Sequence, residues 1–120
     1  NRTEDIKYAF YICEKIVKNS PFNKDKTIIN AFLENRMAQF FYYYKKIKND
    51  PKTKKEYYNL IKEILKYIKR NYGFDFVTTK PKLKKYNDII NFSFEFYYFL
   101  KKFKRKLRLT KMFLKKYFEI

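Results

Sequence analysis

Gly73 is the only glycine in the 120-residue sequence, and only three prolines accompany it. Sheet proteins and phosphate-cradling loops need glycine where φ is positive or where the backbone approaches a ligand closely. A chain with one glycine has little room for tight hairpins, so helices joined by short connections are favoured. We expect an all-α fold, a small antiparallel bundle of four to five helices that ends in a basic helix.

The composition indicates that this chain folds despite its charge. Disordered chains combine high net charge with few aromatic residues. Here the net charge is +18, but 22% of the residues are aromatic and 46% are hydrophobic. A chain of this length corresponds to one domain with a modest core. We divide it into a three-helix core at 1–73, a connecting loop at 74–86 and aromatic, basic C-terminal helices at 87–120.

The first two expected helices span 4–18 and 25–48. Thr3 is suited to cap the first, and Glu4 and Asp5 lie at the positive end of its dipole. Its apolar stripe has helical spacing and comprises Ile6, Ala9, Phe10, Cys13, Ile16 and Val17. The second helix has a face made of Ile29, Phe32, Leu33, Arg36, Phe40, Tyr43, Tyr44 and Ile47, which Met37 and Phe41 widen. Such stripes predict one buried face on each helix.

The third expected helix, at 52–72, carries the clearest helical stripe. Pro51 suits its first position, and Thr53 with Glu56 matches a capping box. Gly73 is the natural stop. The predicted core residues of this helix are Tyr57, Leu60, Ile61, Ile64, Leu65 and Ile68.

The helical period breaks at 74–85, where "FDFVTT" suits a connecting loop or a short extended piece. A fourth helix is expected at 87–104 with Asn87 as its N-cap, and a fifth at about 109–118.

Catalytic constellations are missing from the sequence. It has no histidine, no Gly-rich phosphate motif and no Asp-x-Asp pair. Cys13 is the only cysteine; it rules out an internal disulfide and is expected in the core. Glu4 and Asp5 are interpreted as a charged first helical turn. No catalytic, cofactor-binding or metal-binding residue is therefore assigned to this chain.

The chain begins at Asn1 rather than at methionine, and no signal peptide is visible. We expect it to be a piece of a longer protein. No apolar run reaches the length of about 18–20 residues that a transmembrane helix needs.

The aromatic run "FFYYYKK" at 40–46 could form a platform on which bases stack. On a helix, however, five consecutive rings point in every direction. Phe40, Tyr43 and Tyr44 share one face, and Tyr42 lies across from them. Packing between helices is the favoured interpretation.

Positive charge is concentrated in the second half of the chain. Residues 61–120 contain 17 basic and 5 acidic residues, whereas residues 1–60 contain 13 and 7. In "FSFEFYYFLKKFKRKLRLTKMFLKKYFEI" an aromatic stretch is followed by nine cations. Three interpretations are open: a solvated basic face, a membrane-surface helix and a nucleic-acid interface. Nucleic acid ranks last, because lysine far outnumbers arginine and no reading module is present.

We hypothesise that "FLKKFKRKLRLTKMFLKK" is a membrane-surface element. The cations expected to meet anionic headgroups are Lys101, Lys102, Lys104, Arg105, Lys106, Arg108 and Lys111. The apolar residues expected to enter the interface are Phe103, Leu107, Met112, Phe113 and Leu114.

The segment "FLENRMAQFFYYYKKIKNDPKTKKEYYNLIKEILKYIK" at 32–69 resembles the helical C-terminal region of bacterial family 2 glycosyltransferases. A helix of the "RTEDIKYAFYICEKIVK" type precedes it, as in that family, and the resemblance covers most of residues 1–105. These enzymes have the GT-A fold and build capsules and other cell-surface glycans. Their Asp-x-Asp metal motif and catalytic base would lie before Asn1, so no catalytic residue is transferred.

The resemblance implies an accessory helical region of a nucleotide-sugar-dependent transferase, serving membrane association or oligomerisation. The implied partners are the rest of the parent enzyme, an anionic membrane surface and a second copy of the chain. A divalent metal would belong to the parent enzyme, and the location would be cytoplasmic, peripheral on the inner membrane. The alternative is a stand-alone basic helical module for nucleic acid or protein.

Overall fold

The computed structural model describes residues 2–21, 23–73 and 80–118, and within these it contains five α-helices and no strand. The all-α prediction is confirmed. The helices are α1 (Arg2–Lys18), α2 (Lys26–Lys46), α3 (Pro51–Tyr72), α4 (Lys80–Asn91) and α5 (Phe94–Phe118).

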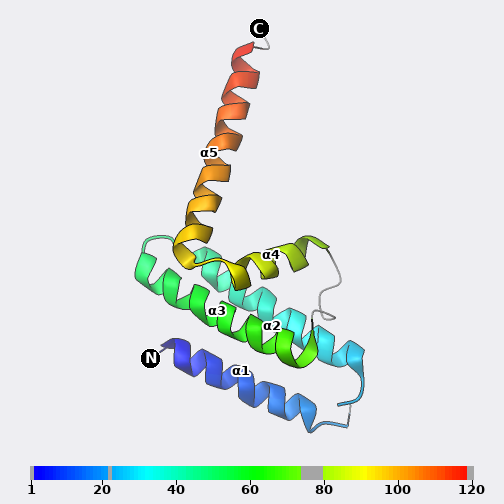
Figure 1. Ribbon diagram of the computed structural model, residues 1–120. Coiled ribbons are helices and arrows are strands. Elements are labelled where there is room, and N and C mark those ends of the chain that lie inside the picture. The colour runs from blue at the N-terminus through cyan, green and yellow to red at the C-terminus, as the bar shows by residue number, and fades with distance from the viewer. Residues whose placement is uncertain (1, 22, 74–79, 119–120) are drawn as a thin grey trace.

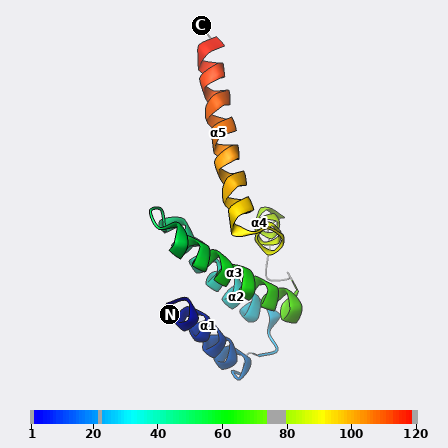
Figure 2. The ribbon, with the colours of Figure 1, turned by 60° about the vertical axis from the view of Figure 1, so that its left-hand side comes forward.

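The first three helices lie side by side with alternating direction, and α4 and α5 join them from one side (Figure 1). α3 packs against each of the other four helices. α5 extends away from this body, as both ribbon views show (Figure 2). The Cα radius of gyration is therefore 17.7 Å, against about 14 Å for a compact chain of this length.

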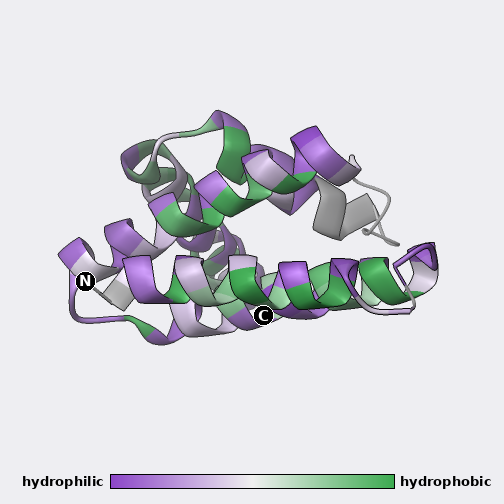
Figure 3. Cartoon of the chain, turned by 90° about the horizontal axis from the view of Figure 1, so that it is seen from below, coloured by the Kyte–Doolittle hydropathy of each residue, from purple (hydrophilic) through white to green (hydrophobic). Residues whose placement is uncertain are grey.

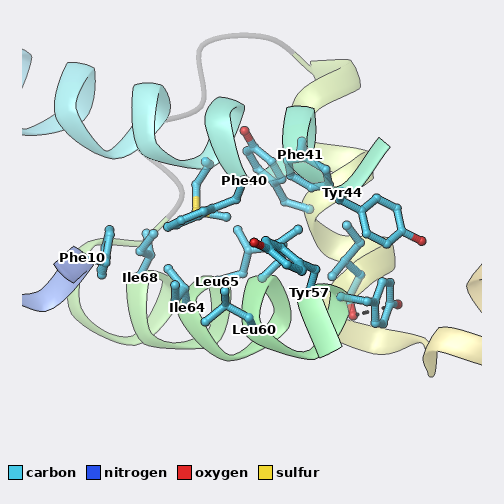
Figure 4. Packing of buried hydrophobic residues seen from close by; sticks show 14 of the residues in the cluster. Phe10, Phe40, Phe41, Tyr44, Tyr57, Leu60, Ile64, Leu65 and Ile68 are labelled. Atoms are coloured by element: carbon cyan, nitrogen blue, oxygen red, sulfur yellow. Dashed lines mark hydrogen bonds between the residues drawn. The ribbon is translucent and has the colours of Figure 1, made fainter. Parts of the chain in front are cut away.

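The core lies mainly between α2 and α3, with Phe10 of α1 at one end (Figure 4). Tyr86 and Ile89 of α4 and Phe94 and Tyr97 of α5 also belong to it. The predicted stripe of α3 is buried, and Ile61, Ile64, Leu65 and Ile68 are each 0% exposed. From α2, the core receives Leu33, Met37, Phe40, Phe41 and Tyr44. Tyr43, expected on the same face, is instead 53% exposed. The aromatic run at 40–46 is thus shared between the core and the surface.

The starts of α1 and α3 differ from the sequence analysis, and Asp50 caps α3. Asp50 accepts the backbone N–H of Thr53 at 3.1 Å, and its other oxygen accepts the Thr53 hydroxyl at 2.6 Å. The capping box of Thr53 with Glu56 is therefore wrong, because Thr53 already lies in the first turn after Pro51. α1 likewise includes Thr3, so Thr3 is not its cap. Gly73 is confirmed as the stop of α3, with φ of 69°.

The expected boundaries after Gly73 need correction. Residues 80–86, predicted as loop, belong to α4, and residues 74–79 lie outside the described part of the chain. The expected helix at 87–104 is interrupted at Phe92 and Ser93. The expected gap between 104 and 109 is absent, since α5 is continuous from Phe94 to Phe118.

Hydrogen bonds from α3 explain why the chain breaks between α4 and α5. The Tyr58 hydroxyl lies 2.7 Å from the carbonyl oxygen of Phe92 and 3.3 Å from that of Ile89. Lys62 Nζ donates to the same Phe92 oxygen at 3.1 Å. Carbonyls at the end of α4 thus find partners outside the helix. Ser93 then caps α5, because its Oγ accepts the backbone N–H of Phe96 at 3.2 Å.

α1 is only partly buried. Hydrophilic and hydrophobic residues alternate along the helices (Figure 3). The apolar stripe of α1 is only partly covered by the other helices. Phe10 is 2% exposed, Cys13 is half-buried rather than in the core, and Ile16 is 65% exposed. Glu14 of α1 is buried, and its carboxylate accepts the hydroxyl groups of Tyr67 and Tyr72 at 2.5–2.8 Å. A polar contact therefore helps to fix α1 on α3.

Leu65→Ala should lower the free energy of unfolding by about 2–5 kcal/mol, since it removes a fully buried side chain and leaves a cavity. Leu109→Ala is the control, because Leu109 is 55% exposed; it should change stability by less than about 0.5 kcal/mol. Urea unfolding followed by circular dichroism measures both. Similar losses for the two variants would contradict the assigned core.

Candidate functional site

The second part of α5, residues 101–118, projects beyond the body and is called the shaft here (Figures 1 and 2). Every side chain in it is exposed. At a rise of 1.5 Å per residue it is about 27 Å long. It carries no acid and nine cations, namely Lys101, Lys102, Lys104, Arg105, Lys106, Arg108, Lys111, Lys115 and Lys116. A solvent-exposed helix of this charge is available to meet a partner along its whole length.

The shaft has an apolar side and a cationic side. At about 100° per residue, one stripe along α5 contains Phe96, Phe99, Leu100, Phe103, Leu107, Leu114 and Tyr117. Phe99 and Phe103 stack with ring centroids 6.2 Å apart, and Phe113 and Tyr117 do the same at the edge of the stripe. The opposite side holds most of the cations. The shaft is therefore amphipathic although none of it is buried.

The apolar stripe faces away from the body of the protein. Phe94 and Tyr97 anchor the first turns of α5, and they are 8% and 5% exposed. Phe96 and Phe99 lie on the other side of the same turns and are 47% and 61% exposed. A flat surface can thus approach the stripe without meeting the other helices.

The predicted site residues all lie on this helix, but on different sides of it. Phe103 lies in the apolar stripe, and Phe113 lies at its edge beside Lys106. Met112 is 61% exposed, but it lies about 160° around the helix from Leu114. Met112 is therefore on the cationic side of the helix, away from Leu114.

Six of the seven predicted cations fall into two groups along the helix, and Lys106 belongs to neither. Lys104, Arg108 and Lys111 belong to a shallow groove along the shaft. Lys101, Lys102 and Arg105 lie at its base and line a cavity together with residues from other helices. Partial desolvation at the base of the shaft and the neighbouring Lys104 and Lys45 lower the pKa of Lys101. Positive charge is thus densest where the shaft leaves the body.

Four further lysines at this cavity were missed by the sequence analysis. They are Lys45, Lys48, Lys54 and Lys85. These residues are distributed over α2, the connection after it, α3 and α4. No local pattern joins them, so only the packing of the helices could reveal the cluster.

Other kinds of site are not found in the described residues. Among 2–21, 23–73 and 80–118, no group of three or more metal-ligating side chains comes together. None of the helices in these ranges is long and apolar enough to cross a bilayer.

Comparisons with family models, with curated proteins and with solved structures found no match to this chain. The resemblance to glycosyltransferases accordingly stays a prediction.

The amides of residues 105–118 should exchange with solvent at least about a hundred times faster than those of 57–68. The shaft has only its own helical hydrogen bonds and no burial, so it opens locally, whereas α3 opens only when the core does. Hydrogen–deuterium exchange measured by mass spectrometry compares the two segments. Equal protection would show that the shaft is packed against something in solution.

Proposed function

We propose that this helical unit binds the surface of an anionic membrane through the shaft of α5. The observation that carries the proposal is the two-sided character of residues 101–118. An apolar stripe faces away from the body, and nine cations occupy the rest of the helix. Interfacial helices have this arrangement, with the apolar side in the acyl boundary and the basic side among the headgroups.

Both energetic contributions needed for such binding are present. Each cation near an anionic leaflet contributes about 1 kcal/mol, so several together exceed thermal energy many times. Phe103 and Leu107 are 49% and 46% exposed and supply apolar area for insertion. Lys104, Lys106 and Lys111 flank the stripe. Their side chains are long enough to reach headgroups while their aliphatic stems remain in the apolar layer.

Self-association through the same stripe is the second candidate, because its spacing also suits a coiled coil. Leu100, Leu107 and Leu114 recur every seven residues, and Phe96, Phe103, Thr110 and Tyr117 occupy the intervening heptad positions. The flanking positions, however, are lysines at 104, 106 and 111. Two copies would bring these like charges together, whereas a membrane offers negative charge. Charge therefore favours the membrane.

Nucleic acid is the third candidate and uses only part of the surface. Any polyanion attracts the basic side at low salt. Duplex DNA gives no role to an apolar stripe of exposed phenylalanine and leucine, so the membrane accounts for more of the helix.

The double variant Leu107→Ala and Leu114→Ala should weaken binding to phosphatidylcholine vesicles that contain phosphatidylserine by at least about tenfold. Each truncation removes apolar area worth about 1–2 kcal/mol, and 1.4 kcal/mol is a factor of ten. Vesicle sedimentation measures the effect. Wild-type binding should also fall as salt rises, since screening shortens the reach of the cations.

Met112→Ala is the matched control. It also shortens an exposed apolar residue of the shaft without changing charge, but on the cationic side, so vesicle binding should be nearly unchanged. Binding to duplex DNA at low salt should be equal in all variants. A chain that ignores anionic vesicles at about 0.1 M salt, where charges act over about 10 Å, would refute the proposal. Salt-strengthened dimerisation that the double variant abolishes would favour the coiled coil.

We further propose, from the resemblance alone, that the unit is an accessory region of a glycosyltransferase. The full gene tests this directly. An α/β domain with an Asp-x-Asp motif encoded before Asn1 is the expected result. A start codon immediately before Asn1 would contradict it.

A further inference from the structure

A cavity of about 520 Å³ is lined by residues of α2, α3, α4, α5 and the connection after α2. These four helices meet where α5 leaves the body (Figure 1). Seven of its eleven lining residues are lysine or arginine, and the other four are aromatic. None of the lining residues in the described part of the chain is acidic. A cavity of this size falls within the range of small-molecule sites, about 300–1,000 Å³.

Aromatic rings form the apolar part of the lining and hold the cations in place. Phe41, Tyr44 and Tyr97 are buried. Lys85 Nζ lies 4.0 Å from the ring centroid of Phe41, and Lys54 Nζ lies 4.5 Å from that of Tyr44. On α5, Lys101 and Lys102 Nζ lie 5.4 and 4.6 Å from the ring centroids of Tyr97 and Tyr98. Each contact favours the charged amine and restricts where it can point.

The cations in the cavity repel one another. Burial, together with the charges of Lys45 and Lys101, lowers the pKa of Lys85 to about 8. Burial also lowers the pKa of Lys54. At Lys101 the negative charge of Asp88 partly offsets the lowering of the pKa by desolvation and by neighbouring lysines.

Another nearby acid, Glu95, is engaged away from the cavity. Glu95 pairs with Lys55, with an N–O distance of 2.6 Å. The fold thus gathers positive charge from four elements without lining the cavity with negative charge, and a bound anion would relieve the repulsion.

We propose that this cavity binds a compact ligand that carries two or more phosphate groups. Several cations around one hollow match a multiply charged anion better than a single carboxylate, and lysine binds phosphate as a point charge. The concave shape suits a compact group rather than an extended backbone. The aromatic lining would contact an apolar or planar part of the ligand.

The phosphates could belong to a soluble molecule or to a lipid headgroup, and the lining does not distinguish these sources. Occupation of the cavity does not require the apolar stripe of the shaft to meet a membrane. The two proposals therefore stand or fall separately.

The test compares two double variants with the same charge. Lys45→Gln with Lys85→Gln removes two cations from the lining. Lys46→Gln with Lys84→Gln removes their sequence neighbours, which do not line the cavity. Each pair lowers the net charge from +18 by two, so long-range attraction is matched between them.

Isothermal calorimetry with inorganic tripolyphosphate is the first measurement. The lining pair should weaken binding at least about tenfold, since hydrogen bonds to charged groups are the strong ones, and the neighbour pair should change it less than about threefold. At pH 8, binding to the wild type should take up protons, because the anion favours charged Lys85. Comparing buffers of different ionisation enthalpy detects this uptake, which the lining pair should lose.

Thermal melting separates loss of binding from loss of folding. Without ligand, the lining pair should melt at or above the wild-type temperature, because repulsion is reduced. Tripolyphosphate should raise the melting temperature of the wild type and of the neighbour pair, but not that of the lining pair.

A vesicle arm identifies the source of the phosphates. Phosphatidylcholine vesicles containing phosphatidylinositol bisphosphate should bind less well to the lining pair than to the neighbour pair if a headgroup enters the cavity. Equal binding of both pairs to these vesicles, together with selective loss of tripolyphosphate, would assign a soluble ligand. The proposal would be overturned if both pairs weakened tripolyphosphate binding equally. It would also be overturned if the wild type showed no saturable binding. The membrane proposal is tested separately, by the effect of Leu107→Ala with Leu114→Ala on binding to phosphatidylserine vesicles. A negative result for the cavity therefore does not change the outcome of that test.

Discussion

Burial of one apolar stripe on α3 is the constraint on which the rest of the structure depends. Ile61, Ile64, Leu65 and Ile68 are completely buried, and α3 is the helix that packs against all four others. Burying apolar area is the main favourable contribution to folding, at about 25 cal/mol per Å². The other helices are positioned by their contact with this stripe, with α2 on one side and α1, α4 and the base of α5 around it. Even Glu14, a buried polar residue, acts through tyrosines of α3.

The junction between α4 and α5 converts this packing into an exposed surface. Tyr58 and Lys62, both on α3, bind the carbonyl oxygen of Phe92, and Ser93 starts a new helix in a new direction. Because Phe94 and Tyr97 face the core, the stripe with Phe96 and Phe99 must face solvent. The same junction brings lysines of α2, α3 and α4 next to those at the base of the shaft. Exposure of the stripe and clustering of the charge thus have one structural cause.

The excess of positive charge then acts differently in two places. Along the shaft, the cations are spread over an exposed helix and are well hydrated, so they attract an extended negative surface and discourage pairing with a second copy. At the cavity, burial and proximity make the charged state of Lys85 costly. A compact anion would relieve that cost. The proposed membrane contact and the proposed phosphate site follow from this difference in how the cations are arranged.

The sequence by itself determined the helical class, the core stripe of α3, its stop at Gly73 and the basic, aromatic character of the C-terminal segment. These features follow from the local spacing of apolar residues and from composition, and they do not depend on which helices pack nearby. Tertiary structure decided where α4 and α5 divide, because carbonyls at the end of α4 found donors on α3 some 30 residues away in sequence, as in the Tyr58–Ile89 and Lys62–Phe92 contacts. The cluster at Lys45, Lys54 and Lys85 was beyond any sequence pattern, because residues distant along the chain become neighbours only when their helices pack on one core.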